Sequence, residues 1–322
     1  MSNPQSQATL EFEKSSFRLS KLHFEPESFS AQYGCMIIFE EDDVINELRY
    51  KLNVTFLEQE EFTSTLLVDR EPDFFINDKI PNNLNEIIPF EVSSFIYPLV
   101  VETNYQGNIS RINNFDEIKI RWKKLKNTLN RKYDNAILAK YIKQSENYLR
   151  SIQSFEKRIF QDWFLNLYFA PIYTSYSDDL YTFKQIGYPI IKGISPINYQ
   201  IKQKIIESPK DIRITLNGEI DDPRCALDIE QGSNTPYFSI INPKEKKLKG
   251  TNDILYFVNK NSGVIEGYNA VFETSFYIPK KVTIKMFLLE HISTKKSVII
   301  EDETYTTKTK PKKNFFSKLF KG

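Results

Sequence analysis

Helical and strand-like periodicities occupy different parts of this 322-residue chain, and this separation constrains the fold more than any other feature. Apolar and polar residues alternate from Leu48 to Phe56, which is typical of a strand with one buried face. From Phe115 to Leu129, apolar residues recur at spacings of three and four, which predicts a helix. Strand patterns return after Pro171. We therefore expect an α+β fold: mainly antiparallel β-sheet in two strand-rich parts around a central group of two or three helices.

Turn signals add detail to this prediction. Asn217-Gly218 separates two short apolar runs and is the strongest hairpin signal in the chain. Further hairpins are expected to turn at Tyr105–Gly107 and at Asn259–Gly263. Residues 36–39 and 65–68 are expected to be strands that neighbour residues 48–56 in an antiparallel arrangement.

These signals divide the chain into five segments without a clear linker between them. The expected segments are a flexible N-terminal arm (1–30), an N-terminal β-rich part (31–113), a central helical segment (114–170), a C-terminal β-rich part (171–304) and a basic amphipathic tail (305–322). The two β-rich parts could share one extended sheet or form two. We favour one continuous unit.

Composition excludes several classes of function. Lys and Arg number 43 and Asp and Glu 42, so the net charge is +1 and a nucleic-acid-coating protein is not expected. Two histidines and two cysteines leave little for zinc sites or for serine–histidine and cysteine–histidine catalysis. His23 falls in the polar arm and His291 closes an expected strand, so neither is a strong candidate for a catalytic base. The chain also lacks a P-loop and a GxGxxG motif, and we expect no cofactor and no metal.

The densest acidic segment, residues 219–230, is the main candidate for chemistry. Its carboxylates are Glu219, Asp221, Asp222, Asp228 and Glu230. Several carboxylates at short range suit a hard cation, although the spacing is not that of an EF-hand. Paired carboxylates also serve hydrolases, which keeps a carboxylate-using enzyme as an alternative. The other interpretation is a solvated loop in which Arg224 pairs with a neighbouring Asp.

Two basic regions remain. The central helix carries basic residues opposite its apolar stripe, and this face suits either solvent or a phosphate or acidic partner. Its members are Lys119, Arg121, Lys123, Lys124, Lys126, Arg131 and Lys132.

The tail combines apolar side chains at helical spacing with surrounding lysines. Its expected partner-binding residues are Lys312, Lys313, Phe315, Phe316, Lys318, Leu319, Phe320 and Lys321. Such a segment is too short to cross a bilayer and suits docking into a groove on a partner protein. Weak contact with an anionic membrane surface and packing back onto its own domain are the other interpretations.

The sequence also predicts a compartment. The first 16 residues lack the basic and apolar regions of a secretory signal, and no apolar run approaches the length of a membrane-spanning helix. Cys35 and Cys225 are far apart and are expected to be reduced core residues. We therefore expect a cytoplasmic protein.

Several short motifs resemble those of an uncharacterised protein family of Bacteroidota. They are residues 97–109 (YPLVVETNYQGNI), 114–118 (NFDEI), 121–122 (RW), 169–173 (FAPIY), 218–224 (GEIDDPR) and 315–320 (FFSKLF). The resemblance implies an association with contractile, type VI-like secretion systems and brings no catalytic residue. Our first hypothesis is therefore a non-enzymatic interaction protein: a soluble adaptor, chaperone or structural accessory of a larger assembly. The alternatives are the hydrolase and a binder of an apolar ligand in a sheet-lined cavity, and the oligomeric state is open.

Overall fold

Eleven strands dominate the computed structural model, which describes Leu22, Phe24 and residues 28–176, 179–208, 211–242, 244–245 and 247–292. The strands are β1 (Ser30–Glu41), β2 (Val44–Gln59), β3 (Thr63–Ile76), β4 (Leu99–Asn104), β5 (Ile109–Ile112), β6 (Tyr181–Tyr188), β7 (Ile197–Glu207), β8 (Asp211–Ile220), β9 (Gly250–Asn259), β10 (Ile265–Thr274) and β11 (Lys280–Ile292). They form one sheet in the order β5-β4-β3-β2-β1-β11-β10-β9-β8-β7-β6, with every neighbouring pair antiparallel.

A single sheet corrects part of the predicted architecture. The antiparallel α+β class is confirmed, but the expectation of two strand-rich parts around a central group of helices is wrong. Strand β1 pairs with β11 from Ser30↔Ile292 to Glu41↔Lys280 and so joins the two halves. Without this pairing, β1 and β11 would each leave a row of backbone N–H and C=O groups unpaired at a sheet edge, and the pairing satisfies both rows.

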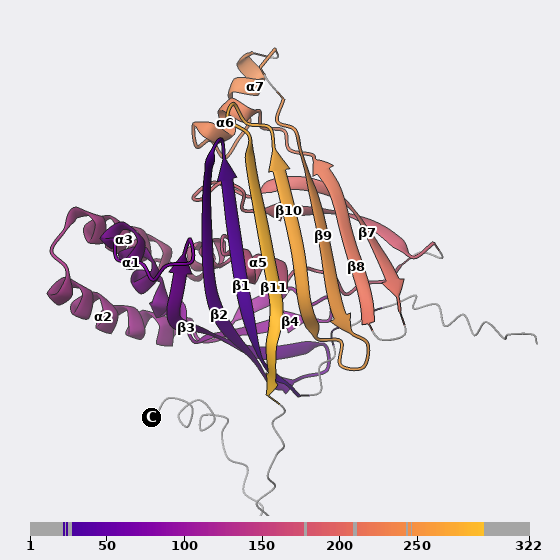
Figure 1. Cartoon of the computed structure of the whole chain (residues 1–322), viewed down its shortest axis with the longest axis horizontal. Coiled ribbons are helices and arrows are strands. Elements are labelled where there is room, and N and C mark those ends of the chain that lie inside the picture. The colour runs from indigo at the N-terminus through magenta and orange to yellow at the C-terminus, as the bar shows by residue number, and fades with distance from the viewer. Residues whose placement is uncertain are drawn as a thin grey trace, which may run out of the picture.

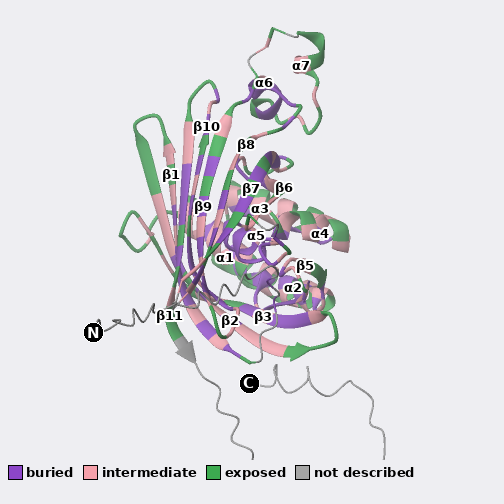
Figure 2. Cartoon of the chain, turned by 90° about the vertical axis from the view of Figure 1, so that its right-hand side faces the viewer, coloured by how far each residue is buried: buried purple, intermediate pink, exposed green. Residues whose placement is uncertain are grey.

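Helices α1 to α5 lie on one face of this curved sheet, and α6 and α7 lie at one end of its strands (Figures 1 and 2). They are α1 (Leu84–Ser93), α2 (Phe115–Lys132), α3 (Ala136–Tyr148), α4 (Ile152–Ile159), α5 (Trp163–Tyr168), α6 (Ala226–Glu230) and α7 (Phe238–Ile241), with a 3₁₀ turn at Ser94–Ile96. The central segment thus holds four helices rather than two or three. The break between α4 and α5 has a local cause, because the Asp162 side chain accepts a hydrogen bond from the Leu165 N–H and begins a new helix.

Helix α5 lies at the centre of the core. Its sequence is apolar almost all round, which suits a helix surrounded by other elements. Tyr33 of β1 packs its ring 5.5 Å from that of Tyr168, and Trp163 lies 5.0 Å from Phe272 of β10. The Tyr256 hydroxyl donates to the Leu167 carbonyl at 2.9 Å. Aromatic side chains therefore fill the space between sheet and helix.

One of the expected hairpin turns lies inside a strand instead. Asn217-Gly218 was expected to turn a hairpin but lies inside β8, paired with β7 and β9. A Cβ on Gly218 would come within 2.4 Å of the Gln200 carbonyl oxygen, so this glycine permits close strand packing. The hairpins at Tyr105–Gly107 and Asn259–Gly263 are confirmed.

Within the predicted N-terminal arm, Leu22 and Phe24 are buried, and their N–H groups donate to the carbonyls of Thr174 and Tyr105.

Candidate functional site

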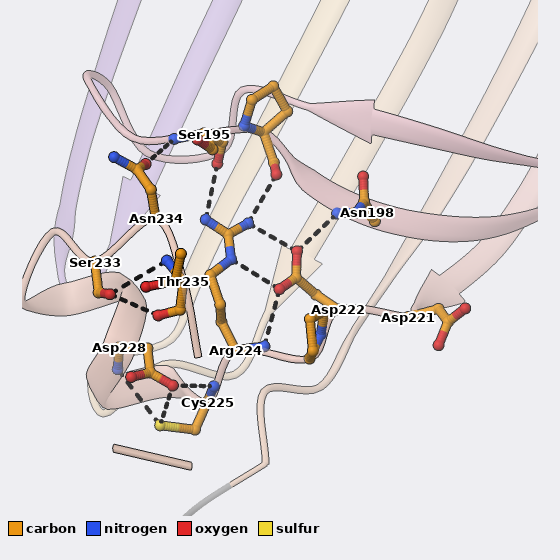
Figure 3. A network of polar contacts seen from close by, with 12 residues as sticks. Ser195, Asn198, Asp221, Asp222, Arg224, Cys225, Asp228, Ser233, Asn234 and Thr235 are labelled. Atoms are coloured by element: carbon orange, nitrogen blue, oxygen red, sulfur yellow. Dashed lines mark hydrogen bonds and ion pairs between the residues drawn. The ribbon is translucent and has the colours of Figure 1, made fainter. Parts of the chain in front are cut away.

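The acidic segment between β8 and α6 is organised by a buried ion pair (Figure 3). Arg224 donates to both carboxylate oxygens of Asp222, at 2.8 Å through Nε and at 2.7 Å through Nη2. The two side chains are only 4% and 1% exposed. Arg224 also donates through Nη1 to the Ser195 carbonyl and through Nη2 to the Pro196 carbonyl, and these two residues immediately precede β7. Arg224 therefore ties this segment to the sheet. The expected pairing of Arg224 with a neighbouring Asp is confirmed, but the expectation of a solvated loop is wrong at this pair, because both side chains are buried.

A second carboxylate, Asp228, organises the next turn of chain. It has no exposed surface, and one oxygen accepts hydrogen bonds from the N–H groups of Tyr237 at 2.9 Å and Phe238 at 2.6 Å. The other accepts from the Cys225 N–H at 3.0 Å, the Cys225 thiol at 3.1 Å and the Ser239 N–H at 3.4 Å. Asp228 thus fixes α7 to α6.

Electrostatics at both carboxylates favour the charged form. Burial by itself opposes ionisation of Asp222, but hydrogen bonds from Arg224 and from the Asn198 N–H hold its pKa below the ordinary value. Burial is likewise outweighed at Asp228, where the bonds from Cys225, Phe238 and Tyr237 hold the pKa well below the ordinary range. Both groups are therefore ionised at neutral pH and committed to protein donors.

The acids of this segment do not converge on one point. Asp221 points away from the Arg224 network (Figure 3), and Glu230 accepts a hydrogen bond from the Tyr277 N–H at 3.0 Å. Within the described residues, no group of three or more His, Cys, Asp or Glu side chains is placed to hold a metal ion. The arrangement holds loops together and leaves no pair of acids facing an open space in this network.

A set of exposed apolar side chains, on α7 and in the turn between β10 and β11, lies at the same end of the molecule. We call it the α7 patch, and it consists of Tyr237, Ile240, Ile241, Tyr277 and Ile278. These side chains are between 50% and 69% exposed. The Tyr277 hydroxyl donates to Glu245 at 2.6 Å, which joins the turn between β10 and β11 to the α7 segment. Figures 1 and 2 show α7 projecting beyond the ends of the strands.

Sequence reasoning missed the α7 patch. Its signal is the run Tyr237–Ile241, which is rich in apolar residues but too short to cover a core. Periodicity cannot separate such a run from a buried strand, and none of the residues in α7 is buried.

The basic face of α2 is largely occupied by protein partners. Arg121 donates to the carbonyls of Phe95, Ile96 and Pro98 at 2.8–3.2 Å. Ion pairs join other members to nearby acids: Lys119 to Asp116, Lys126 to Glu146 and Lys132 to Glu91. Four of the seven basic side chains therefore hold protein partners, whereas Lys123, Lys124 and Arg131 are exposed to solvent.

The remaining predicted site residues lie outside the described part of the chain. This holds for the tail residues from Lys312 to Lys321 and for His23. Among the described residues, no helix is both long enough and apolar enough to cross a bilayer.

Comparisons with known proteins add little. No protein-family model matches the chain, and no curated protein matches it. Among solved structures, one similar chain is that of a study titled "Lipid-protein interactions in lipovitellin", with a TM-score of 0.39 and 9% sequence identity. The match covers 83% of this chain and only 26% of that chain. A likeness at this level carries no conclusion about fold or function, so the site must be interpreted from its own geometry.

Proposed function

We propose that this protein is a non-enzymatic interaction protein, an adaptor or structural accessory of a larger assembly. The observation that carries the proposal is the α7 patch. Exposed apolar clusters of this kind are typical of protein–protein contact sites, and tyrosine is enriched among the residues that dominate binding energy. We further propose that the tail, from Lys312 to Lys321, supplies a second contact with the same partner.

The way the patch is held supports this proposal. Asp228 anchors α7 through the N–H groups of Tyr237, Phe238 and Ser239, and Glu230 anchors the turn that carries Tyr277. Because the backbone is already positioned, binding would cost less conformational entropy than ordering a free loop. A buried, charge-assisted network is thus used to present apolar side chains to solvent.

The geometry gives less support to the two alternatives. A carboxylate-using hydrolase needs two acids placed about a substrate, whereas Asp222 and Asp228 are occupied by protein donors. A binder of apolar ligands needs open space on the concave face of the sheet, where α5 packs against the aromatic rings of Tyr33 and Phe272.

The test is a tagged pull-down from the native cell, followed by reconstitution with the purified partner. Three chains are compared: the full chain, a chain ending at Thr306, and the double variant Ile240→Ser and Ile241→Ser. Burial of two isoleucines contributes about 3 kcal/mol or more, so the double variant should weaken binding by at least about 10-fold. Ile120→Ser, on exposed α2 surface, is the matched control and should leave binding unchanged.

The resemblance to the Bacteroidota family makes a contractile secretion apparatus the first assembly in which to look for the partner. Recovery of the same proteins with all four chains would contradict the proposal, because neither the patch nor the tail would then be needed.

A further inference from the structure

An open groove crosses the face of the sheet that the helices leave uncovered. Its volume is about 470 Å³. The floor is formed by Gly34 and Met36 of β1 with Arg49 and Lys51 of β2. Phe287 and Leu289 of β11 line one side, and Glu71, Asp73, Phe75 and Asp78, on and just after β3, line the other. We call this feature the outer groove.

The backbone explains why a hollow exists here. Phe287 of β11 is paired with a glycine on each neighbouring strand, Gly34 on β1 and Gly267 on β10. Neither paired residue therefore has a side chain next to the Phe287 ring. A Cβ on Gly34 would come within 2.8 Å of the ring, which shows that Phe287 lies across the glycine. Glycine in a strand interior often marks a place where another segment approaches closely.

The opposite wall of the groove contains a β-bulge in β3. The register between β2 and β3 shifts between the pairs Leu52↔Arg70 and Tyr50↔Phe74, so β3 carries extra residues there. Glu71 lies in this bulge and reaches across β2, where it accepts a hydrogen bond from Gln32 Nε2 of β1 at 2.6 Å.

The groove has apolar side chains on both sides, the cations Arg49 and Lys51 on its floor, and carboxylates along the β3 wall. Phe75, Phe287 and Leu289 are between 41% and 48% exposed. Asp78 forms an ion pair with Arg49, whereas Glu71 and Asp73 have no cationic partner among the residues that the structure describes. The outer groove therefore suits a segment with apolar side chains flanked by lysines.

We propose that the outer groove binds the tail of the same chain, through Phe315, Phe316, Leu319 and Phe320. The tail carries lysines at both ends of this apolar set, Lys312 and Lys313 before it and Lys321 after it, which complement Glu71 and Asp73. It also follows β11, the strand that contributes Phe287 and Leu289 and ends at Ile292.

Connectivity makes an intramolecular contact favourable. The chain between Ile292 and Phe315 has about 20 residues and can span on the order of 70 Å, far more than the width of a few strands. A tethered segment experiences an effective concentration in the millimolar range. Even an intrinsic Kd of about 0.1 mM would then keep the groove about 90% occupied. This inference rests on the proposed function: the tail is covered by its own sheet until a partner competes for it.

A labelled peptide of residues 307–322 tests the proposal. Fluorescence anisotropy is measured with the chain ending at Thr306 and with the full chain. We expect the shortened chain to bind the peptide with a Kd near 0.1 mM and the full chain to bind at least about 10-fold more weakly, because its groove is occupied. A peptide with Phe316→Ser and Phe320→Ser should not bind.

Groove variants locate the contact. In the shortened chain, Leu289→Lys and Asp73→Lys should each weaken peptide binding by at least about 5-fold. Ile206→Lys is the matched control on the same sheet face, since Ile206 is 44% exposed on distant β7, and should bind as the parent does. Circular dichroism verifies that each variant is folded.

Three results would overturn the proposal. They are no peptide binding by the shortened chain, equal weakening by Ile206→Lys, or equal binding by the full and shortened chains. Partner recovery separates this proposal from the proposed function: if the chain ending at Thr306 loses its partner yet does not bind the peptide, the adaptor role stands and the outer groove is not the tail site. If both proposals hold, Leu289→Lys in the full chain should bind the partner more tightly, because the tail is released.

Discussion

Replacement of Asp228 by asparagine should release α7 and lower stability. The carboxylate accepts backbone N–H bonds on both oxygens: Tyr237 and Phe238 on one, Cys225 and Ser239 on the other. An asparagine amide replaces one oxygen by an NH₂ group, so two backbone donors lose their acceptor whichever way the amide points. Each unsatisfied buried donor costs about 1–3 kcal/mol, and because none of the α7 residues that carry these donors is buried, the lower half of the range applies. We expect a loss of about 3 kcal/mol.

Two measurements check this value. Urea denaturation at pH 7 gives the change in unfolding free energy, and hydrogen exchange of residues 237–242 reports whether α7 detaches. A loss below about 1 kcal/mol with unchanged exchange in α7 would refute the reasoning, because the carboxylate would then not be what holds the helix.

The pH dependence adds an independent check. Because the pKa of Asp228 is depressed in the folded chain, the unfolded chain binds a proton first as the pH falls. The stability that Asp228 contributes is therefore complete above its unfolded pKa of about 3.9 and is lost progressively below it. The difference between parent and Asp228→Asn should be constant from pH 7 to 5 and should shrink below about pH 4.

Three further predictions concern the fold. Ile118→Ala, at a fully buried position of α2, should cost about 3 kcal/mol in urea denaturation, whereas Ile120→Ala, 54% exposed on the same helix, should change stability by less than about 0.5 kcal/mol. Gly107→Ala should cost at least about 1 kcal/mol more than Gly193→Ala: both glycines have φ near +85°, but only a Cβ at position 107 meets an aromatic ring, at 2.6 Å, and equal losses would contradict this. Burial lowers the pKa of Lys184 to about 8, so the unfolded chain holds this proton to higher pH and the stability of the parent relative to Lys184→Met should rise by about 2 kcal/mol between pH 7 and 10. A flat difference across that range would mean that Lys184 is solvated in the folded chain.

Local patterns were sufficient where one face of an element is buried. The alternation from Leu48 to Phe56 correctly predicted β2, and the helical spacing from Phe115 to Leu129 correctly predicted α2. The hairpin between β9 and β10 was equally visible, because its turn lies between two well-patterned strands. In each case, the residues that carry the signal are close in sequence and the environment on each face is uniform.

Local patterns failed where a distant element decides the outcome. Asn217-Gly218 has the composition of a turn, yet β7 and β9 on its two sides hold it in a strand. Helix α1 was not predicted, since Pro89 lies inside it and its buried face is limited to Ile88 and Val92.

The candidate site likewise has features that local sequence predicts and features that only contacts between distant residues decide. The acidic segment was recognisable by composition, and the pairing of Arg224 with a neighbouring Asp belonged to one of three interpretations of it. The hydrogen bonds that Asp228 accepts from the N–H groups at the start of α7 could not be predicted, because a carboxylate in the sequence does not indicate which backbone donors will surround it. The α7 patch was missed for a related reason. Isoleucine is most often buried, so an isoleucine in a short apolar run is assigned to the core, and only the packed structure shows that it is exposed.

The sequence alone determined the class of the protein: antiparallel strands before and after a helical centre, near-neutral charge, and side chains poorly suited to the common catalytic and metal centres. Tertiary structure alone decided that β1 and β11 pair and join both halves into one sheet, and that α7 projects with an apolar surface. Periodicity encodes which face of an element is buried, and this information is local. The partner of a strand edge depends on which other edges remain unpaired when the whole chain has packed, and no local pattern contains that information.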